Sequence, residues 1–225
     1  LEGIENVMLF EREGEMIDTF LTLIEDADIL SGWNSEGYDI PYTVNRTARV
    51  LSKDDTRRFC LWGQLPKKRD YEKYGKAAVT FDLVGRVHLD SLELYRKYTY
   101  EERHTYRLDA IGEIEVGENK VPYEGTLDQL YNNDFRKFIE YNIQDTALLD
   151  KLDKKLRFID LSNTVAHENT VLLQTTMGAV AVTEQGIINE AHNRGLQVPN
   201  RKGRDDTENT QAAGAYVAFP KKGLH

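Results

Sequence analysis

One aspartate falls on a helix face where apolar residues are expected. The stretch from Leu127 to Leu156 predicts helix, with a break near Asn132-Asn133. At about 100° per residue counted from Phe135, one side of the helix collects four apolar residues: Phe138, Leu149, Leu152 and Leu156. Asp145 falls in the middle of that side, and an aspartate is rarely buried unless it is paired or bound to a cation. It therefore needs a partner, which is either a local one, such as an arginine or a cap, or a metal ion.

A second aspartate follows the end of a strand. Residues 28–33 predict a short strand that turns through residues 34–37 and enters a helix, with Pro41 in the first turn, where a missing N–H does no harm. In open α/β sheets, ligands bind at such strand ends. Asp39 stands near the helix start, where capping is the ordinary role. Asp39 and Asp145 together supply two acids on different elements, as a shared cation site requires.

Short strands alternate with helices elsewhere in the chain. Apolar residues predict a strand over residues 6–10 and a helix over 15–24, ahead of the strand at 28–33. Residues 175–188 predict one more helix after the long one. This alternation is typical of an α/β sheet with helices on its faces.

A hairpin and a capped helix are predicted in the middle of the chain. Residues 79–84 and 86–89 flank Gly85 and predict a β-hairpin. Asp90, with Glu93 three residues later, has the spacing of a capping box at the start of a helix. We therefore assign both acids to helix capping and not to catalysis.

Several other polar residues are given structural roles. Residues 53–76 are predicted as a solvated loop, and contact with a DNA backbone is the alternative interpretation of its basic cluster, Lys67-Lys68-Arg69. His88 and His104 have no partner at metal-ligand spacing. Cys60 is the only cysteine, so it forms no disulfide within the chain and fits a reducing compartment.

The composition limits the class of protein. Its 225 residues, 40% hydrophobic and 30% charged, suit one globular domain with or without an appendage. The net charge of −9 disfavours a stand-alone nonspecific nucleic-acid binder, which needs a basic face. The excess of acidic residues fits either carboxylates that collect divalent cations or an ordinary solvated surface. No apolar run approaches the roughly 20 residues of a bilayer span, and the start lacks a signal-peptide pattern.

Two short motifs at the aspartates resemble a known family. Asn34-x-x-x-Tyr38-Asp39 is similar to the second exonuclease motif of the family B DNA polymerases, and Tyr141-x-x-x-Asp145 is similar to their third. The surrounding stretches resemble the T-even bacteriophage branch in order and spacing: residues 32–34, 38–42, 88–95 and 141–145, followed by 214–220, which resemble the approach to the palm domain. This ordered series covers nearly the whole chain and is far more specific than Tyr-x-x-x-Asp alone.

The resemblance implies a fold and a division of the chain. The fold would be α/β and ribonuclease-H-like, with a mixed sheet flanked by helices, N-terminally truncated and followed by an α-helical or irregular C-terminal segment. Residues 1–158 would form the 3′→5′ exonuclease domain without its first motif. Residues 159–225 would return to the N-terminal domain of the polymerase and lead towards the palm.

The resemblance also implies roles for individual residues. Asp39 and Asp145 would be metal ligands for two divalent cations, Mg²⁺ or Mn²⁺, about 3.5–4 Å apart, which activate water and stabilise the leaving oxygen in phosphodiester hydrolysis. Tyr141 would orient the attacking water, which makes Asp39, Tyr141 and Asp145 the catalytic set. Asn34 and Tyr38 would bind the single-stranded DNA 3′ end, and Tyr38 would stack on an unpaired base.

The implied parent is a replicative, phage-encoded DNA-directed DNA polymerase. It would work in the cytoplasm of an infected bacterium, neither secreted nor bound to a membrane, with primer–template DNA and a sliding clamp as partners. An Asp-x-Glu motif, which would supply the other two acids of the site, is expected before Leu1, and the polymerase motif is expected after His225. We therefore expect the chain by itself to lack nuclease activity. Two alternatives stay open: a non-catalytic DNA-holding scaffold with vestigial acids, and a stand-alone exonuclease of the same fold.

Overall fold

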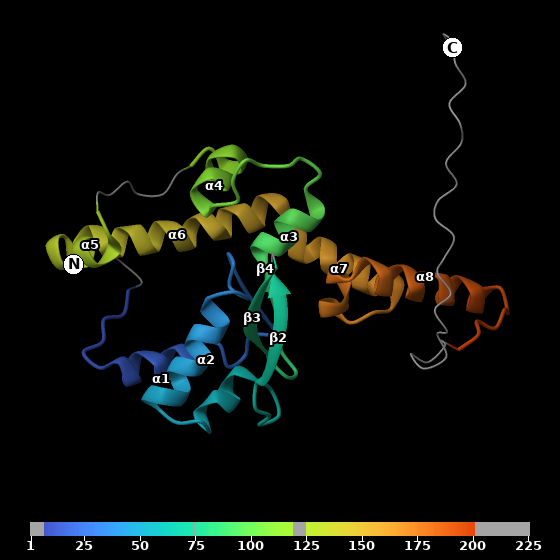
Figure 1. The fold of residues 1–225 in the computed structure, drawn as a ribbon, viewed down its shortest axis with the longest axis horizontal. Helices are drawn as coiled ribbons and strands as arrows, with labels where there is room; N and C mark the ends of the chain where they lie inside the picture. The colour runs from blue at the N-terminus through green and yellow to red at the C-terminus, as the bar shows by residue number, and fades with distance from the viewer. Residues whose placement is uncertain (1–6, 74, 119–124, 201–225) are drawn as a thin grey trace, which may run out of the picture. The chain divides into compact units, whose positions relative to one another are not determined.

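The computed structural model describes residues 7–73, 75–118 and 125–200 (Figure 1). The helices are α1 (Glu13–Leu23), α2 (Asp39–Val50), α3 (Ser91–Tyr98), α4 (Leu108–Val116), α5 (Leu127–Asn133), α6 (Phe135–Leu156), α7 (Phe158–Asn169) and α8 (Ala179–Asn193). Two 3₁₀ helices, η1 (Asp55–Phe59) and η2 (Leu173–Met177), and the strands β1 (Ile29–Gly32), β2 (Lys67–Lys73), β3 (Lys76–Asp82) and β4 (Val87–Asp90) complete the elements. The residues described up to Gly186 form one compact unit. None of the helices in the described ranges is long and apolar enough to cross a membrane.

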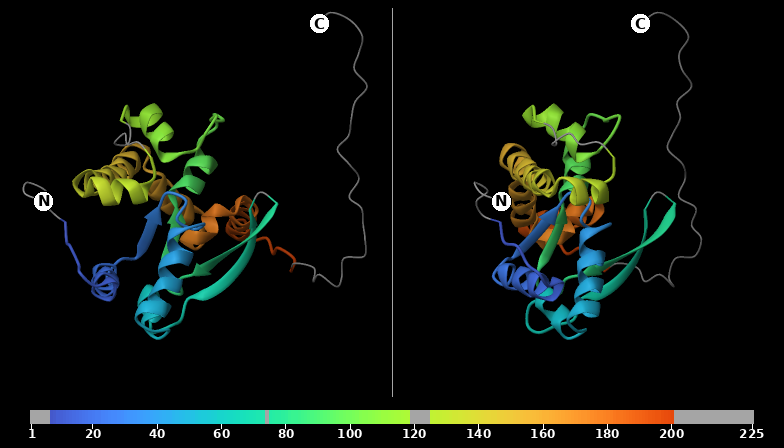
Figure 2. Two further views of the ribbon diagram at one scale, coloured as in Figure 1. Left: turned by 60° about the vertical axis from the view of Figure 1, so that its left-hand side comes forward. Right: turned by 90° about the vertical axis from the view of Figure 1, so that its left-hand side faces the viewer.

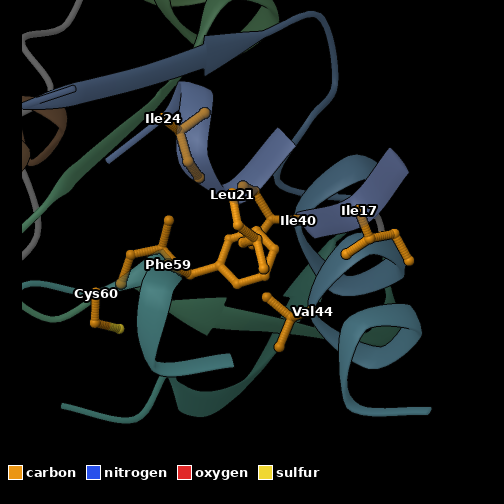
Figure 3. Packing of buried hydrophobic residues seen from close by; sticks show 8 residues of the cluster. Ile17, Leu21, Ile24, Ile40, Val44, Phe59 and Cys60 are labelled. Carbon is orange, nitrogen blue, oxygen red and sulfur yellow. The ribbon is translucent and has the colours of Figure 1, made fainter. Parts of the chain in front are cut away.

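A hydrophobic cluster joins α1, α2 and η1 (Figure 3). Leu21 of α1 is fully buried, and Ile17 lies one turn before it on the same side of the helix. Ile40 and Val44 repeat this four-residue spacing on α2. Phe59 of η1 fills the space between the two helices, as Figure 3 shows. The helix predicted over residues 15–24 is therefore confirmed, and its apolar stripe is what packs it against α2.

A second cluster joins α3, α4 and α6. Its buried members are Tyr95, Ile111, Leu148 and Leu152. A side chain at Gly112 of α4 would begin 2.7 Å from a methyl group of Leu148, so α4 and α6 pack this closely only because that position is glycine. Figure 1 shows the long α6 running beside α4. This cluster fixes the middle of α6, where Asp145 lies.

The strands form two pairs of different kinds. β1 and β4 are parallel, with Gly32 opposite Asp90, and β2 and β3 are antiparallel, with Lys67 opposite Asp82. Figure 2 shows β2 and β3 as a long ribbon beside α2. The α/β class is thus confirmed, and parallel and antiparallel pairing occur in separate two-stranded sheets within the described part of the chain.

The hairpin was predicted in the wrong place. β3 pairs with β2, whereas β4 pairs with the distant β1. Gly85, with φ at +84°, instead sits in a turn that carries the chain from one sheet to the other, and the N–H of Arg86 donates to the carbonyl oxygen of Leu83 across 3.1 Å. The sequence pattern does not reveal that β4 finds its partner more than 50 residues away.

The solvated loop predicted over residues 53–76 is also wrong. It contains η1 and β2, and the basic cluster Lys67-Lys68-Arg69 lies within β2. Alternating apolar residues do not mark this strand, because it is largely polar on both faces. It is held in place by hydrogen bonds to β3.

The predictions at the two ends of the chain have mixed outcomes. Residues 7–10 of the predicted first strand have no regular structure, and residue 6 lies outside the described ranges. The break in the long helix is confirmed: Asp134 separates α5 from α6 and accepts a hydrogen bond from the N–H of Lys137 at 3.0 Å. The helix predicted at 175–188 is realised as η2 and α8, and residues 214–220 lie outside the described ranges.

We expect Leu148→Ala to destabilise the chain by about 2–5 kcal/mol, because it leaves a cavity where α4 and α6 pack most closely. Ile143→Ala on the same helix is the matched control, since Ile143 is 40% exposed. Urea denaturation followed by circular dichroism measures both. Equal losses of stability in the two variants would contradict the packing described for α6.

Candidate functional site

The turn after β1 is tightly built. A side chain on Gly32 would begin 2.8 Å from the Cβ atom of Ser35, so the turn requires glycine there. The hydroxyl of Ser35 donates to the carbonyl oxygen of Gly32 at 3.0 Å and lies 2.8 Å from Nε2 of His88. His88 therefore has the structural role predicted for it, and burial lowers the pKa of its imidazole.

Asp90 holds this turn against the neighbouring strand. Its buried carboxylate accepts hydrogen bonds from the backbone N–H groups of Asn34 and Glu36, both at 3.0 Å, and of Leu92 at 2.9 Å. The bond from Leu92 is the helix cap predicted for Asp90. The other two bonds were not predicted, because they join residues more than 50 positions apart. Burial raises the pKa of the Asp90 carboxyl, and the three N–H donors oppose this shift.

Two predicted substrate-binding residues lie on this turn and are solvent-exposed. Asn34 has a left-handed backbone with φ at +60°, which asparagine tolerates better than most residues. Tyr38 is 63% exposed, and its ring stacks on that of Tyr42 with centroids 5.7 Å apart and planes 7° apart. The two rings present a flat aromatic surface directly beside Asp39.

Asp39 is the first residue of α2. The N-cap is Tyr38, whose side chain makes no capping bond, so the capping role considered for Asp39 is not the one it has. The residue is exposed, yet nearby protein atoms partly desolvate its carboxyl and raise the pKa, while its own N–H opposes the shift. No lysine or arginine among the described residues forms an ion pair with Asp39. The positive end of the helix dipole favours an anion at this position.

Tyr141 and Asp145 lie one turn apart on α6 and are both half-buried. The buried residues of α6 are Leu148 and Leu152, so of the four apolar residues predicted to face the core only Leu152 is fully buried. At about 100° per residue, Tyr141 lies in the middle of the buried face and Asp145 lies to its side, not in the middle as predicted. The two side chains still share one side of the helix.

Trp33 connects the turn to α6. It directly precedes Asn34, donates from Nε1 to the carbonyl oxygen of Tyr106 at 3.0 Å, and packs against the cluster that contains Leu148 and Leu152. The turn that leads to Asp39 and the helix that carries Asp145 therefore share one core. Within the described ranges, no group of three or more His, Cys, Asp or Glu side chains could hold a metal ion.

A cavity of about 400 Å³ opens beside Asn34. The residues that line it are Trp33, Asn34, Leu92, Arg96, Thr105, Tyr106 and Arg107. The guanidinium of Arg96 lies over the ring of Tyr106, 4.5 Å from its centroid. The cavity thus combines aromatic and cationic groups, as sites that hold nucleotides do.

Residues 1–111 match the family model for the exonuclease domain of DNA polymerase family B. The matched part of the chain includes the turn, Asp39 and Asp90.

The similarity to polymerases extends over nearly the whole chain. The DNA-directed DNA polymerase of Enterobacteria phage T4 is 27% identical over 216 residues, which cover 95% of this chain and 24% of that protein. The corresponding polymerase of Escherichia phage RB69 is 27% identical over 194 residues, covering 85% and 21%. The DNA polymerase delta catalytic subunit of Drosophila melanogaster is 26% identical over 235 residues, covering 97% and 21%. The chain spans about a quarter of the length of these relatives.

The raised pKa of Asp39 predicts how Asp39→Asn changes the pH dependence of stability. The folded chain favours the protonated Asp39 carboxyl. The contribution of this carboxyl to the free energy of unfolding is therefore fully present below the ordinary aspartate pKa of about 3.9, and it is lost as pH rises through the pKa of Asp39 in the folded chain. The free energy of unfolding of the natural chain minus that of the variant should therefore fall as pH rises. Urea denaturation in a series of buffers measures this difference, and a difference that grows with pH would contradict the prediction.

Proposed function

We propose that the chain is part of a replicative DNA-directed DNA polymerase and carries part of its 3′→5′ proofreading site. The observation that carries this proposal is the position of the family match. It covers the turn at the carboxyl ends of the parallel strands β1 and β4, which is where open α/β sheets bind ligands and where Asp39 lies. A ribonuclease-H-like fold, with residues 1–158 as the exonuclease domain and 159–225 as the return towards the palm, belongs to the same proposal.

In this proposal Asp39 and Asp145 hold the divalent cations. Carboxylate oxygens are the ligands that Mg²⁺ and Mn²⁺ prefer. The partly desolvated carboxyl of Asp39 suits this role, because a bound cation would offset the cost of ionising it. When bound, the cations would activate water and stabilise the leaving oxygen of the phosphodiester.

The remaining residues would bind and orient the substrate. Tyr141, one turn from Asp145, would direct its hydroxyl to the attacking water. Tyr38 offers an exposed ring on which an unpaired base can stack, and the stack with Tyr42 keeps that ring in place. Asn34 would contact the DNA 3′ end at the mouth of the cavity that Arg96 lines.

The partners follow from the proposed parent. They are the single-stranded 3′ end, primer–template DNA and a sliding clamp, in the cytoplasm of an infected bacterium. Asp39 and Asp145 are two of the four acids expected at such a site. We therefore propose that the 225-residue chain by itself binds cations weakly and degrades single-stranded DNA negligibly.

Calorimetric titration of the chain with Mn²⁺ tests the proposed ligands. We expect Asp39→Asn and Asp145→Asn each to weaken binding at least tenfold, because each removes one of the carboxylates that neutralise the cation. Asp26→Asn is the matched control, since Asp26 is an exposed aspartate outside the proposed site, and it should bind as the natural chain does.

Three results would overturn the proposal. If the chain binds no Mn²⁺, or if Asp26→Asn weakens binding as much as the site variants do, the two acids are not a metal site and the scaffold alternative is favoured. Clear Mn²⁺-dependent degradation of single-stranded DNA that Asp145→Asn abolishes would instead identify a complete nuclease.

A further inference from the structure

Arg69 of β2 bridges the turn after β1 and the hairpin that β2 and β3 form. Its Nη2 atom lies 2.6 Å from the Glu36 carboxylate, and its Nε atom lies 2.8 Å from the carboxylate of Asp82 on β3. Asp82 lies on the hairpin and Glu36 on the turn, so one guanidinium joins the hairpin to the turn. The ring of Tyr71, two residues along β2, lies 5.5 Å from the guanidinium.

Glu36 is held from two directions. Its backbone N–H donates to Asp90 at 3.0 Å, and its side chain, 23% exposed, accepts from Arg69. The first contact fixes the turn to β4, and the second fixes it to the hairpin. The N–H of Ile40 in turn donates to the carbonyl oxygen of Ser35 at 2.9 Å, so the same turn leads rigidly into the start of α2.

We infer that Arg69 is a positioning residue that sets the pose of residues 34–39 through Glu36. Displacement of the hairpin, by any ligand or neighbouring domain, is transmitted through this pair to the segment that carries Asn34, Tyr38 and Asp39. The bridge itself stands on the contacts described above. Its effect on nuclease chemistry rests on the proposed function.

The geometry requires arginine at this position. A guanidinium offers donors in a rigid fork that reach two carboxylates at once, whereas a lysine ammonium is a single point charge. The alternative role for Arg69 is to stabilise the hairpin of β2 and β3 alone, through Asp82. The two roles differ in which amides they protect, because only the positioning role reaches residues 34–39.

Amide hydrogen exchange on the 225-residue chain separates the two roles without requiring metal binding or nuclease activity. We expect Arg69→Ala to speed exchange of the Asn34 and Glu36 amides about three- to tenfold, and Arg69→Lys to give an intermediate rate. Lys68→Ala is the matched control, because Lys68 lies on the same strand and pairs with Asp70 at 3.6 Å. It should leave residues 34–39 at their natural rate. Unchanged exchange within α6 shows that each variant is folded.

A double-mutant cycle tests the route of transmission. In a Glu36→Gln background, Arg69→Ala should add nothing further at residues 34–39, because the pair is already broken. Additive effects would overturn the inference, and so would an Arg69→Ala variant in which only residues 67–82 exchange faster. If Arg69→Ala unfolds the chain, the comparison of Arg69→Lys with Lys68→Ala decides the question in the same way. Failure of Mn²⁺ binding would overturn the proposed function and leave this result unaffected.

Discussion

The carboxylate of Asp90 is the constraint on which the candidate site depends. It lies at the end of β4, opposite the end of β1, and accepts three backbone N–H bonds from two segments. One of these starts α3, and the other is the turn that leads into α2. A buried carboxylate is costly unless donors surround it, so the three bonds and the burial depend on one another. The Asp90 carboxylate therefore ties the turn to β4, and Asp39 follows the turn at this edge of the sheet.

Local sequence patterns predict the helices well. The four-residue spacing of Ile17 and Leu21 marks α1, and Asp134 marks the break before α6. The strand pairing is less predictable, because β4 pairs with a strand more than 50 residues earlier and β2 has no apolar face. The face of α6 that is buried also depends on what packs against it. Gly112 leaves room for Leu148, so the buried side includes Leu148 and not Phe138.

The candidate site is predictable in its parts and not in its connections. Residue types and spacing single out Asp39 and Asp145, and the family match supports the segment around the first of these. The bonds that position Asp39 were missed, since Asp90 has the appearance of a simple helix cap and Arg69 that of a residue in a solvated loop. Both form contacts across more than 30 residues of sequence, and short motifs contain no record of such contacts.

We propose that Asp39 and Asp145 bind the same cations, and paramagnetic broadening by Mn²⁺ would reveal such a shared site. An NMR titration of the isotopically labelled chain follows the backbone amides around both aspartates, because Mn²⁺ broadens only the nuclei near it. If the site is shared, residues 38–40 and 141–146 will broaden together at the same Mn²⁺ concentrations, and Asp39→Asn will reduce the broadening at both segments. Broadening of one segment alone, or of the two at different concentrations, would contradict a shared site.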